Sequence, residues 1–319
     1  MHRPKRSGGR LDDAARAGWL YYIAGRTQDE IASHMGISRQ AAQRLVSIAV
    51  SDRLIRVQVV HPIARCLELA AALTARYGLR HTEVTPTDPG SDGGSVGIAE
   101  AGAAEILRWL RRTEPLIIAV GTGRTLKAAV DQIAPIDCRQ HRIVSLTGNV
   151  GPDGSAAYYN VIFSMAEAVN ARHFPMPLPV YVSSPDERRL MHGQALIRST
   201  LALAAEADVA FVGIGEMDAT APLCIDGFMT DTELAELRAA GVVGEICGWL
   251  YDASGALVAG ERNLCTASAP IPSRDRATVI ALAKGRKKHA AIRAAVAGGL
   301  VNGLITDEAT AEALLDDAI

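Results

Sequence analysis

The sequence predicts a two-part protein in which an N-terminal helix-turn-helix, with a candidate wing, precedes a larger α/β domain built on a mostly parallel, Rossmann-like sheet. Three observations predict this arrangement. The segment 27–46 has the spacing of two short helices around a tight turn, and apolar strand candidates alternate with helical stretches from about residue 79. The length of 319 residues suits about two domains. We place the boundary between residues 1–60 and 61–319.

The turn signals inside 27–46 are specific. Thr27 followed by Glu30 predicts a capping box that starts the first helix. Gly36 supplies the backbone freedom that the turn requires, and Ser38 is placed to cap the second helix. Apolar side chains fall at inward-facing spacings, namely Ile31, Met35, Ile37 and Leu45, with Ala32 allowing a close helix crossing.

The second helix of this segment directs polar side chains outward. With its cap, these are Ser38, Arg39, Gln40, Gln43 and Arg44. Arg and Gln bond bidentately to guanine and adenine edges in the major groove, so this face is our candidate DNA-reading surface. The alternative is an ordinary solvated helical hairpin.

Charge favours the DNA-reading interpretation. Residues 1–65 carry 11 Lys or Arg residues against 5 acidic ones, a balance of +6, whereas the overall charge of −2 leaves −8 for the rest of the chain. A basic N-terminal module on an acidic body suits nucleic-acid contact confined to one end.

Flanking segments complete the N-terminal part. An amphipathic helix is expected over 11–24, with Ala15, Trp19, Leu20 and Ile23 available to cover the hairpin. The alternation in 54–60 predicts a strand, which is the candidate wing. The segment 63–77 has helical spacing and either connects the two domains or packs against its twin in a dimer.

The pattern of the larger part predicts alternating strands and helices. Such alternation predicts a mostly parallel sheet covered on both faces. The strand candidates are 116–120, 142–146, 180–182, 209–214, 278–282 and 300–305, and an exposed loop is expected at 86–97.

A strand running into a glycine turn gives the sharpest site signal of this part. The segment 116–120 is followed by Gly121, Thr122, Gly123, Arg124 and Thr125, then by a helical stretch. Small residues and free amides at a helix N-terminus form an anion cradle. The sequence has neither the P-loop ending nor the dinucleotide fingerprint, and a plain tight turn is the alternative.

Further candidates follow other strands. A basic turn follows 278–282, and its last residue, Lys288, is the preferred anion ligand, with an exposed basic turn as the alternative. Asn149 lies in a glycine-rich turn and could offer an amide. Glu216 and Glu245 could accept hydrogen bonds from sugar hydroxyls. Carboxyl ends of parallel strands meet at one edge of a sheet, where ligands bind.

Other chemistries find little support in the residues. The five cysteines form no Cys-x-x-Cys unit, so we expect buried, reduced thiols, no metal site and no cofactor. No signal core or run of about 20 apolar residues occurs, so we expect no membrane association and a cytoplasmic location.

The ordered motifs resemble those of a known family. After the helix-turn-helix come Val-Gly-Thr-Gly-Arg-Thr, Val-Gly-Ile-Gly, Gly-Phe-Met-Thr-Asp-Thr-Glu-Leu, Val-Gly-Glu-Ile-Cys-Gly-Trp-Leu-Tyr-Asp and Gly-Leu-Val-Asn-Gly-Leu-Ile-Thr-Asp-Glu. Over nearly the full chain, this order resembles the SorC family of bacterial sugar-responsive transcriptional regulators.

The resemblance implies a large domain related to sugar-phosphate isomerases that binds a sugar, polyol or phosphorylated sugar. It implies assembly into dimers and tetramers on operator DNA. The family's phosphate loop matches 121–125, its lysine matches Lys288, and its usual Asp is Glu245 here. Lys284 replaces a common glycine, and no basic residue follows Asn263, so an unphosphorylated sugar or polyol remains an alternative.

The competing interpretation is an active sugar-phosphate isomerase or deaminase with a helical appendage. Such an enzyme needs a general base beside the open-chain sugar. Glu216 and Glu245 are nominal candidates, but no Asp/His/Glu constellation appears at a convincing spacing, and His192 and His289 are isolated. We therefore expect a DNA-binding regulator without catalytic residues.

Overall fold

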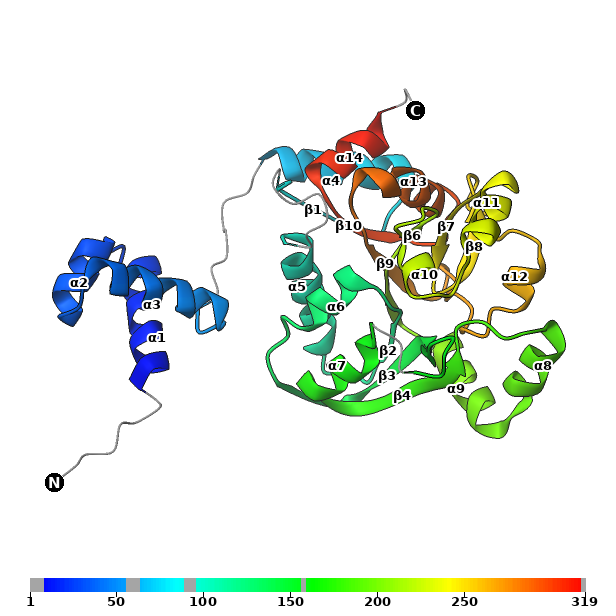
Figure 1. The fold of residues 1–319 in the computed structure, drawn as a ribbon, viewed down its shortest axis with the longest axis horizontal. Coiled ribbons are helices and arrows are strands. Elements are labelled where there is room, and N and C mark those ends of the chain that lie inside the picture. Colours follow the sequence, from blue (N-terminus) through cyan, green and yellow to red (C-terminus); the bar gives the residue numbers. More distant parts are fainter. Residues whose placement is uncertain (1–8, 56–63, 89–95, 156–158, 317–319) are drawn as a thin grey trace. The chain divides into compact units, whose positions relative to one another are not determined.

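The computed structural model describes residues 9–55, 64–88, 96–155 and 159–316. These residues divide into two compact units, one within 1–62 and the other within 63–319. Each unit is described by itself below (Figure 1).

The N-terminal unit contains three helices, α1 (Gly9–Tyr22), α2 (Gln28–Met35) and α3 (Arg39–Ser51). The predicted start of α2 is confirmed, because Thr27 and Glu30 form a reciprocal capping box. Gly36 ends α2 with a left-handed φ of 65°. Ser38 caps α3 by accepting a hydrogen bond from the Ala41 amide at 3.2 Å. Side-chain caps and one glycine therefore fix the hairpin locally.

The prediction that Trp19 and Ile23 help α1 to cover the hairpin is wrong. Trp19 is 54% exposed and Ile23 is 67% exposed. The buried residues of the helix are Ala14, Ala17 and Gly18. A methyl group at Gly18 would collide with Ala49 and Ile55, which shows how closely α1 approaches α3. Large side chains do not fit such a close crossing, so small residues take the inward face.

The candidate wing at 54–60 lies almost entirely outside the described residues, since 56–63 are not described. Its first two positions, Leu54 and Ile55, belong to no strand.

The larger unit is built on a seven-stranded parallel sheet in the order β1-β10-β9-β5-β2-β3-β4. Its strands are β1 (His81–Thr85), β2 (Ile117–Val120), β3 (Ile136–Val150), β4 (Val169–Pro179), β5 (Val209–Val212), β9 (Thr278–Leu282) and β10 (Gly303–Asp307). A separate antiparallel sheet contains β6 (Gly215–Glu216), β7 (Val242–Ile246) and β8 (Trp249–Asp252).

Helices cover both faces of the parallel sheet. Along β2, Ile118 and Val120 join a core formed with α5, α6 and α7, whereas Ala119 faces the opposite core. The helices of this unit are α4 (Ala64–Tyr77), α5 (Ile98–Leu110), α6 (Arg124–Val130), α7 (Val161–Ala168), α8 (Pro185–Gly193), α9 (Ala195–Ala205), α10 (Pro222–Ile225), α11 (Asp231–Ala239), α12 (Glu261–Leu264), α13 (His289–Ala297) and α14 (Glu308–Leu315), with the 3₁₀ turn η1 (Arg286–Lys288).

The expected connecting helix 63–77 is α4, and it packs into the larger unit. Leu69 and Leu73 are buried in its core. The Tyr77 hydroxyl donates to the Leu314 carbonyl at 2.7 Å, and Arg65 pairs with Glu312 at 2.7 Å. The helix therefore begins the larger unit.

Several strand predictions need correction. Residues 180–182 form no strand, because β4 ends at Pro179 and Tyr181 makes only an isolated bridge to Thr266. Pro179, the last residue of β4, has no amide hydrogen with which to continue the ladder. The last strand spans 303–307 and not 300–305. Strands β1 and β4 and the antiparallel sheet correspond to no strand predicted from the sequence.

Within the described residues, no helix combines the length and apolar character needed to cross a membrane.

Candidate functional site

The sheet changes its winding direction between β2 and β5. These strands are neighbours, but the chain passes from β2 to β3 on one side and from β5 to β9 on the other. Ligands of open α/β sheets bind outside the carboxyl ends of strands at such a switch point. The predicted glycine loop begins there, directly after β2.

Close backbone packing explains the glycines at the switch point. A methyl group at Gly213, after β5, would lie 2.8 Å from the carbonyl oxygen of Thr122. A methyl group at Gly121 would lie 2.8 Å from Sγ of Cys247. Gly123 has a φ of 128°, a value that side-chain-bearing residues rarely adopt, and precedes α6. The loops after β2 and β5 are therefore in contact.

The polar side chains of the glycine loop differ in their surroundings. The Thr122 hydroxyl donates to the Tyr159 carbonyl at 2.8 Å. Arg124 is exposed and Thr125 is half-buried. Helix α6 has only seven residues, which limits its contribution to anion binding.

The turn between β7 and β8 brings Glu245 to the same edge. Cys247 and Gly248 have φ values of 54° and 86° and form a two-residue turn between the paired Ile246 and Trp249. The Glu245 carboxylate accepts a hydrogen bond from the Gly248 amide at 2.8 Å. Its other oxygen lies so close to Gly215 that a side chain there would collide. Burial raises the pKa of Glu245, and the nearby Lys288 opposes that rise.

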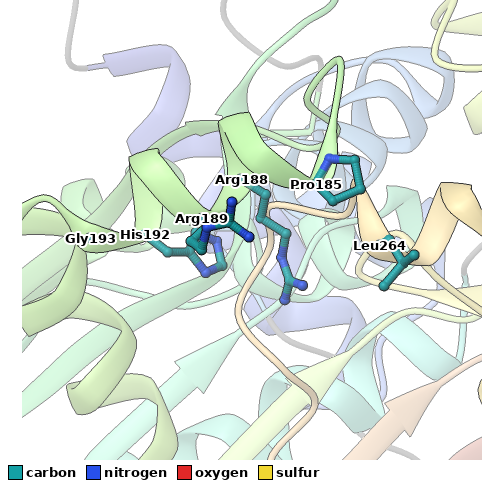
Figure 2. Close-up of a pocket in the computed structure, with 6 residues that line it drawn as sticks. All are labelled: Pro185, Arg188, Arg189, His192, Gly193 and Leu264. Carbon is teal, nitrogen blue, oxygen red and sulfur yellow. The ribbon is translucent and has the colours of Figure 1, made fainter.

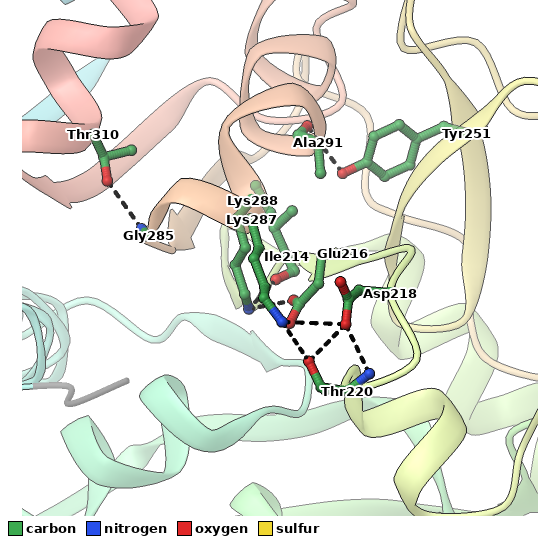
Figure 3. Close-up of polar contacts among 10 residues, drawn as sticks. All are labelled: Ile214, Glu216, Asp218, Thr220, Tyr251, Gly285, Lys287, Lys288, Ala291 and Thr310. Atoms are coloured by element: carbon green, nitrogen blue, oxygen red, sulfur yellow. Dashed lines mark hydrogen bonds and ion pairs between the residues drawn. The ribbon is translucent and has the colours of Figure 1, made fainter. Parts of the chain in front are cut away.

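Lys288, the last residue of η1, lies beside Ile214 and Glu216 of the segment that follows β5 (Figure 3). Its Nζ donates to the Ile214 carbonyl at 2.6 Å and lies 3.2 Å from Oε2 of Glu216. The Glu216 side chain is only 6% exposed and that of Lys288 is 21% exposed. The predicted lysine is therefore paired with a buried carboxylate.

The adjacent Lys287 makes a second, exposed link to the loop after β6. Its Nζ lies 2.9 Å from the Thr220 hydroxyl and 3.3 Å from Asp218 (Figure 3). Hydrogen bonds from Thr220, with a further one from Lys287, lower the pKa of Asp218 to about 2.

Asn149 lies near the end of β3, and its amide is already engaged. Its Nδ2 donates to the Met176 carbonyl of β4 at 3.1 Å, which ties two neighbouring strands together. The described contacts connect Gly121, Gly213, Glu245 and Lys288 through their loops, but they do not connect Asn149 to that group.

Two features of the region were not anticipated. The Glu216–Lys288 pair joins β6 to η1, 72 positions apart in the chain, and neither the spacing nor the composition of the sequence predicts such a pair. Cys247 lies beside Gly121, and burial raises the pKa of its thiol to about 12, while Thr147 and the Thr122 backbone lower it. Its sequence signal was Gly248 alone, because a two-residue hairpin turn with positive φ at both positions favours glycine.

A hollow of about 500 Å³ lies elsewhere, along α8 and beside Leu264 (Figure 2). Its lining includes none of the predicted effector residues. Arg188 lies over the ring of Trp249, and His192 contacts the Ala267 carbonyl at 2.9 Å. His192 thus has a structural partner, whereas the buried Nε of Arg188 has no hydrogen-bond partner among the described residues.

The candidate DNA-reading residues share one exposed face of α3. Ser38, Arg39, Gln40, Gln43 and Arg44 are all exposed, whereas Ala42 and Val46 are buried on the opposite side. Arg39 lies 3.6 Å from the exposed Asp29, a loose pair that water screens.

No group of three or more His, Cys, Asp or Glu side chains within the described ranges is arranged to hold a metal ion.

Comparison with known proteins identifies the family. A family model described as "Putative sugar-binding domain" matches residues 61–316. The erythritol catabolism regulatory protein EryD of Brucella abortus is 33% identical over 303 residues, covering 95% of this chain and 96% of that protein. The transcriptional regulator LsrR of Klebsiella pneumoniae is 32% identical, covering 94% of this chain and 92% of that protein.

A solved structure extends the similarity to three dimensions. The full-length sorbitol operon regulator SorC of Klebsiella pneumoniae has a TM-score of 0.70 and 25% identity, covering 96% of this chain and 99% of that one. The names of these relatives are those of transcriptional regulators and not of enzymes. The chain therefore belongs to the SorC family of sugar-responsive transcriptional regulators.

Proposed function

We propose that this regulator binds operator DNA through α3 and that a sugar, polyol or sugar-phosphate effector changes this binding. The exposed Arg39, Gln40, Gln43 and Arg44 read bases, and other basic residues of 1–60 hold phosphates. Ser38 fixes the start of the reading helix. The relatives' names support the class of function, and the exposed polar face of α3 supports the choice of residues.

The effector binds at the β2/β5 switch point in this proposal. The loop 121–125, Glu245 and Lys288 supply the contacts, and Asn149 supports the site by tying β3 to β4. The single observation that carries this placement is the contact of Lys288 with Ile214 and Glu216, which joins the turn after β9 to the segment after β5. The hollow along α8 lacks these residues.

Residues 1–60 and 61–319 act as separable modules, and the larger one carries self-association into dimers or tetramers. The division of the structure near Pro62 supports this boundary. A purified 61–319 fragment that is soluble, folded and oligomeric supports the proposal, whereas a fragment that aggregates while the full chain stays soluble contradicts it.

The test of the effector site uses a matched pair of lysines. Mobility shifts of the chain's own upstream DNA, titrated with sugars, polyols and their phosphates, first identify a responding compound. We expect Lys288→Ala to weaken the response roughly tenfold or more, because it removes a charge-assisted contact worth about 1.5–3 kcal/mol. Lys287→Ala, which removes an exposed charge next to it, should leave the response near normal.

DNA binding without effector should be the same in both lysine variants. An unchanged response of Lys288→Ala contradicts the placement of the site. Absence of specific binding to upstream DNA by the wild type contradicts the proposed function itself.

An enzymatic function finds no such support. Glu216, a nominal general base, is buried against Lys288, and Glu245 is held by the Gly248 amide. Turnover of common sugar phosphates, measured beside the DNA titration, gives the direct check.

A further inference from the structure

The buried charges at the effector-facing strand ends are already balanced. Lys288 faces Glu216 at 3.2 Å, and Lys284 faces Asp307 at 3.9 Å, with all four side chains at most 21% exposed. Glu245 adds a further carboxyl group beside Lys288. Two cations thus stand against three acidic groups, so this region has no surplus of positive charge with which to bind an anion.

Of the more exposed cations around it, one is paired with a carboxylate. Lys287 pairs with Asp218. Arg124 lies close enough to Asp226 to lower the pKa of that carboxyl, against the larger effect of burial, which raises it. Arg286 is exposed and contributes to lowering the pKa of His289. A phosphate that bound Lys288 or Lys284 would therefore have to displace a carboxylate from its cation.

The Lys288–Glu216 pair also leaves hydrogen-bonding capacity unused. The 3.2 Å contact is not aligned as a hydrogen bond, and Oε2 of Glu216 is buried without any hydrogen-bond partner among the described residues. The ammonium group has three donors, and its aligned hydrogen bond goes to the Ile214 carbonyl. A spare donor thus lies beside a spare, buried acceptor.

We propose that the effector is an uncharged polyhydroxy compound, a polyol or free sugar, and that Glu216 excludes phosphorylated analogues by occupying Lys288. This inference rests on the proposed function and narrows its ligand class. A hydroxyl group accepts from Lys288 and donates to Glu216 at once, so it satisfies both groups without disturbing the charge balance. A phosphate monoester carries roughly −1.5 to −2 charge at neutral pH and offers mainly acceptors, so it opposes Glu216 and Glu245.

The test measures selectivity in the full-length chain. Calorimetry and thermal shift compare erythritol, xylitol and D-sorbitol with their phosphate monoesters and with inorganic phosphate at constant ionic strength. We expect the wild type to bind at least one polyol tenfold or more tightly than its monoester, and to show no binding of inorganic phosphate.

Substitution of Glu216 should reverse this preference. Glu216→Gln keeps the shape and an acceptor but removes the charge, so the preference for the polyol over its monoester should fall at least tenfold and inorganic phosphate should bind. Glu216→Asp, which keeps the charge, should still exclude phosphate. Asp218→Asn, the matched change at the exposed pair, should behave as the wild type. Unfolding temperatures of all variants, measured without ligand, establish that each is folded.

Each result decides the proposal. Tighter binding of the monoester by the wild type overturns it, as does an unchanged preference in a folded Glu216→Gln variant. A wild type that binds none of the polyols and none of the monoesters also counts against it. The DNA titration separates failure of this proposal from failure of the proposed function. If another compound changes binding to the upstream DNA, the proposed regulatory function still stands.

Discussion

The two candidate binding surfaces of this regulator use charge in opposite ways. On α3, Arg39 and Arg44 are exposed, and the acid paired with Arg39, Asp29, is a loose partner at 3.6 Å. At the strand ends, Lys288 and Glu216 are largely buried and lie 3.2 Å apart. Exposed cations suit a polyanion whose phosphates lie outside the protein, whereas a buried, neutralised pair suits a small ligand that replaces water. The comparison predicts that substitutions separate the two functions.

The largest effect is expected on α3. Simultaneous replacement of Arg39, Gln40, Gln43 and Arg44 by Ala should abolish preference for operator over scrambled DNA, a loss of roughly 10³-fold or more in specific affinity. The free energy of unfolding should change little, because all four side chains are exposed. Competition binding and urea denaturation measure the two quantities. Unchanged operator preference would show that another surface reads the DNA.

A smaller effect, in folding and not in DNA contact, is expected at the switch point. Gly213→Ala places a methyl group 2.8 Å from the Thr122 carbonyl oxygen, so the loops after β2 and β5 must separate. We expect a loss of about 1–3 kcal/mol in the free energy of unfolding, typical of overpacking. Gly193→Ala is the control, because a methyl group there meets no atom within 4 Å. Equal stability of the two variants would contradict the close contact.

The smallest effect concerns the pH dependence of stability. Burial raises the pKa of Glu245, so the folded state holds this proton to higher pH than the unfolded chain does. The contribution of this group to stability is therefore greatest below its unfolded pKa and is lost as pH rises through its folded pKa. Glu245→Gln keeps an acceptor for the Gly248 amide and should reduce this decline above pH 4.5. Denaturation between pH 4 and 7 is the measurement, and identical slopes for both proteins would contradict it.

The features predicted best from the sequence are local ones. Thr27, Gly36 and Ser38 each act on backbone groups within four residues, so the sequence alone specifies the hairpin. The βα alternation likewise predicts a parallel sheet, because buried strands are continuous apolar runs. Strand β4 was missed since three of its positions are proline, and β1 since its position at the sheet edge allows polar residues such as Glu83.

The partners of the site residues could not be predicted in the same way. The sequence indicated Lys288 and Glu245 by residue type and by their place after strands, but their nearest charges come from loops distant in the chain. The inward face of α1 was misjudged for a related reason: helix spacing gives the period of a face, while the distance to α3 decides whether Trp19 or Gly18 fits on it. Such distances are set by tertiary packing.

The buried thiol of Cys247 offers a chemical probe of how often the β7–β8 turn opens. A thiol reacts as its thiolate, and burial keeps this one protonated, with a pKa of about 12. Alkylation of Cys247 therefore requires the β7–β8 turn to open away from Gly121. The rate of alkylation then measures how often the turn opens. A compound that binds across the turn slows the labelling of this cysteine, so peptide-resolved alkylation reports occupancy of the site in the unmodified protein.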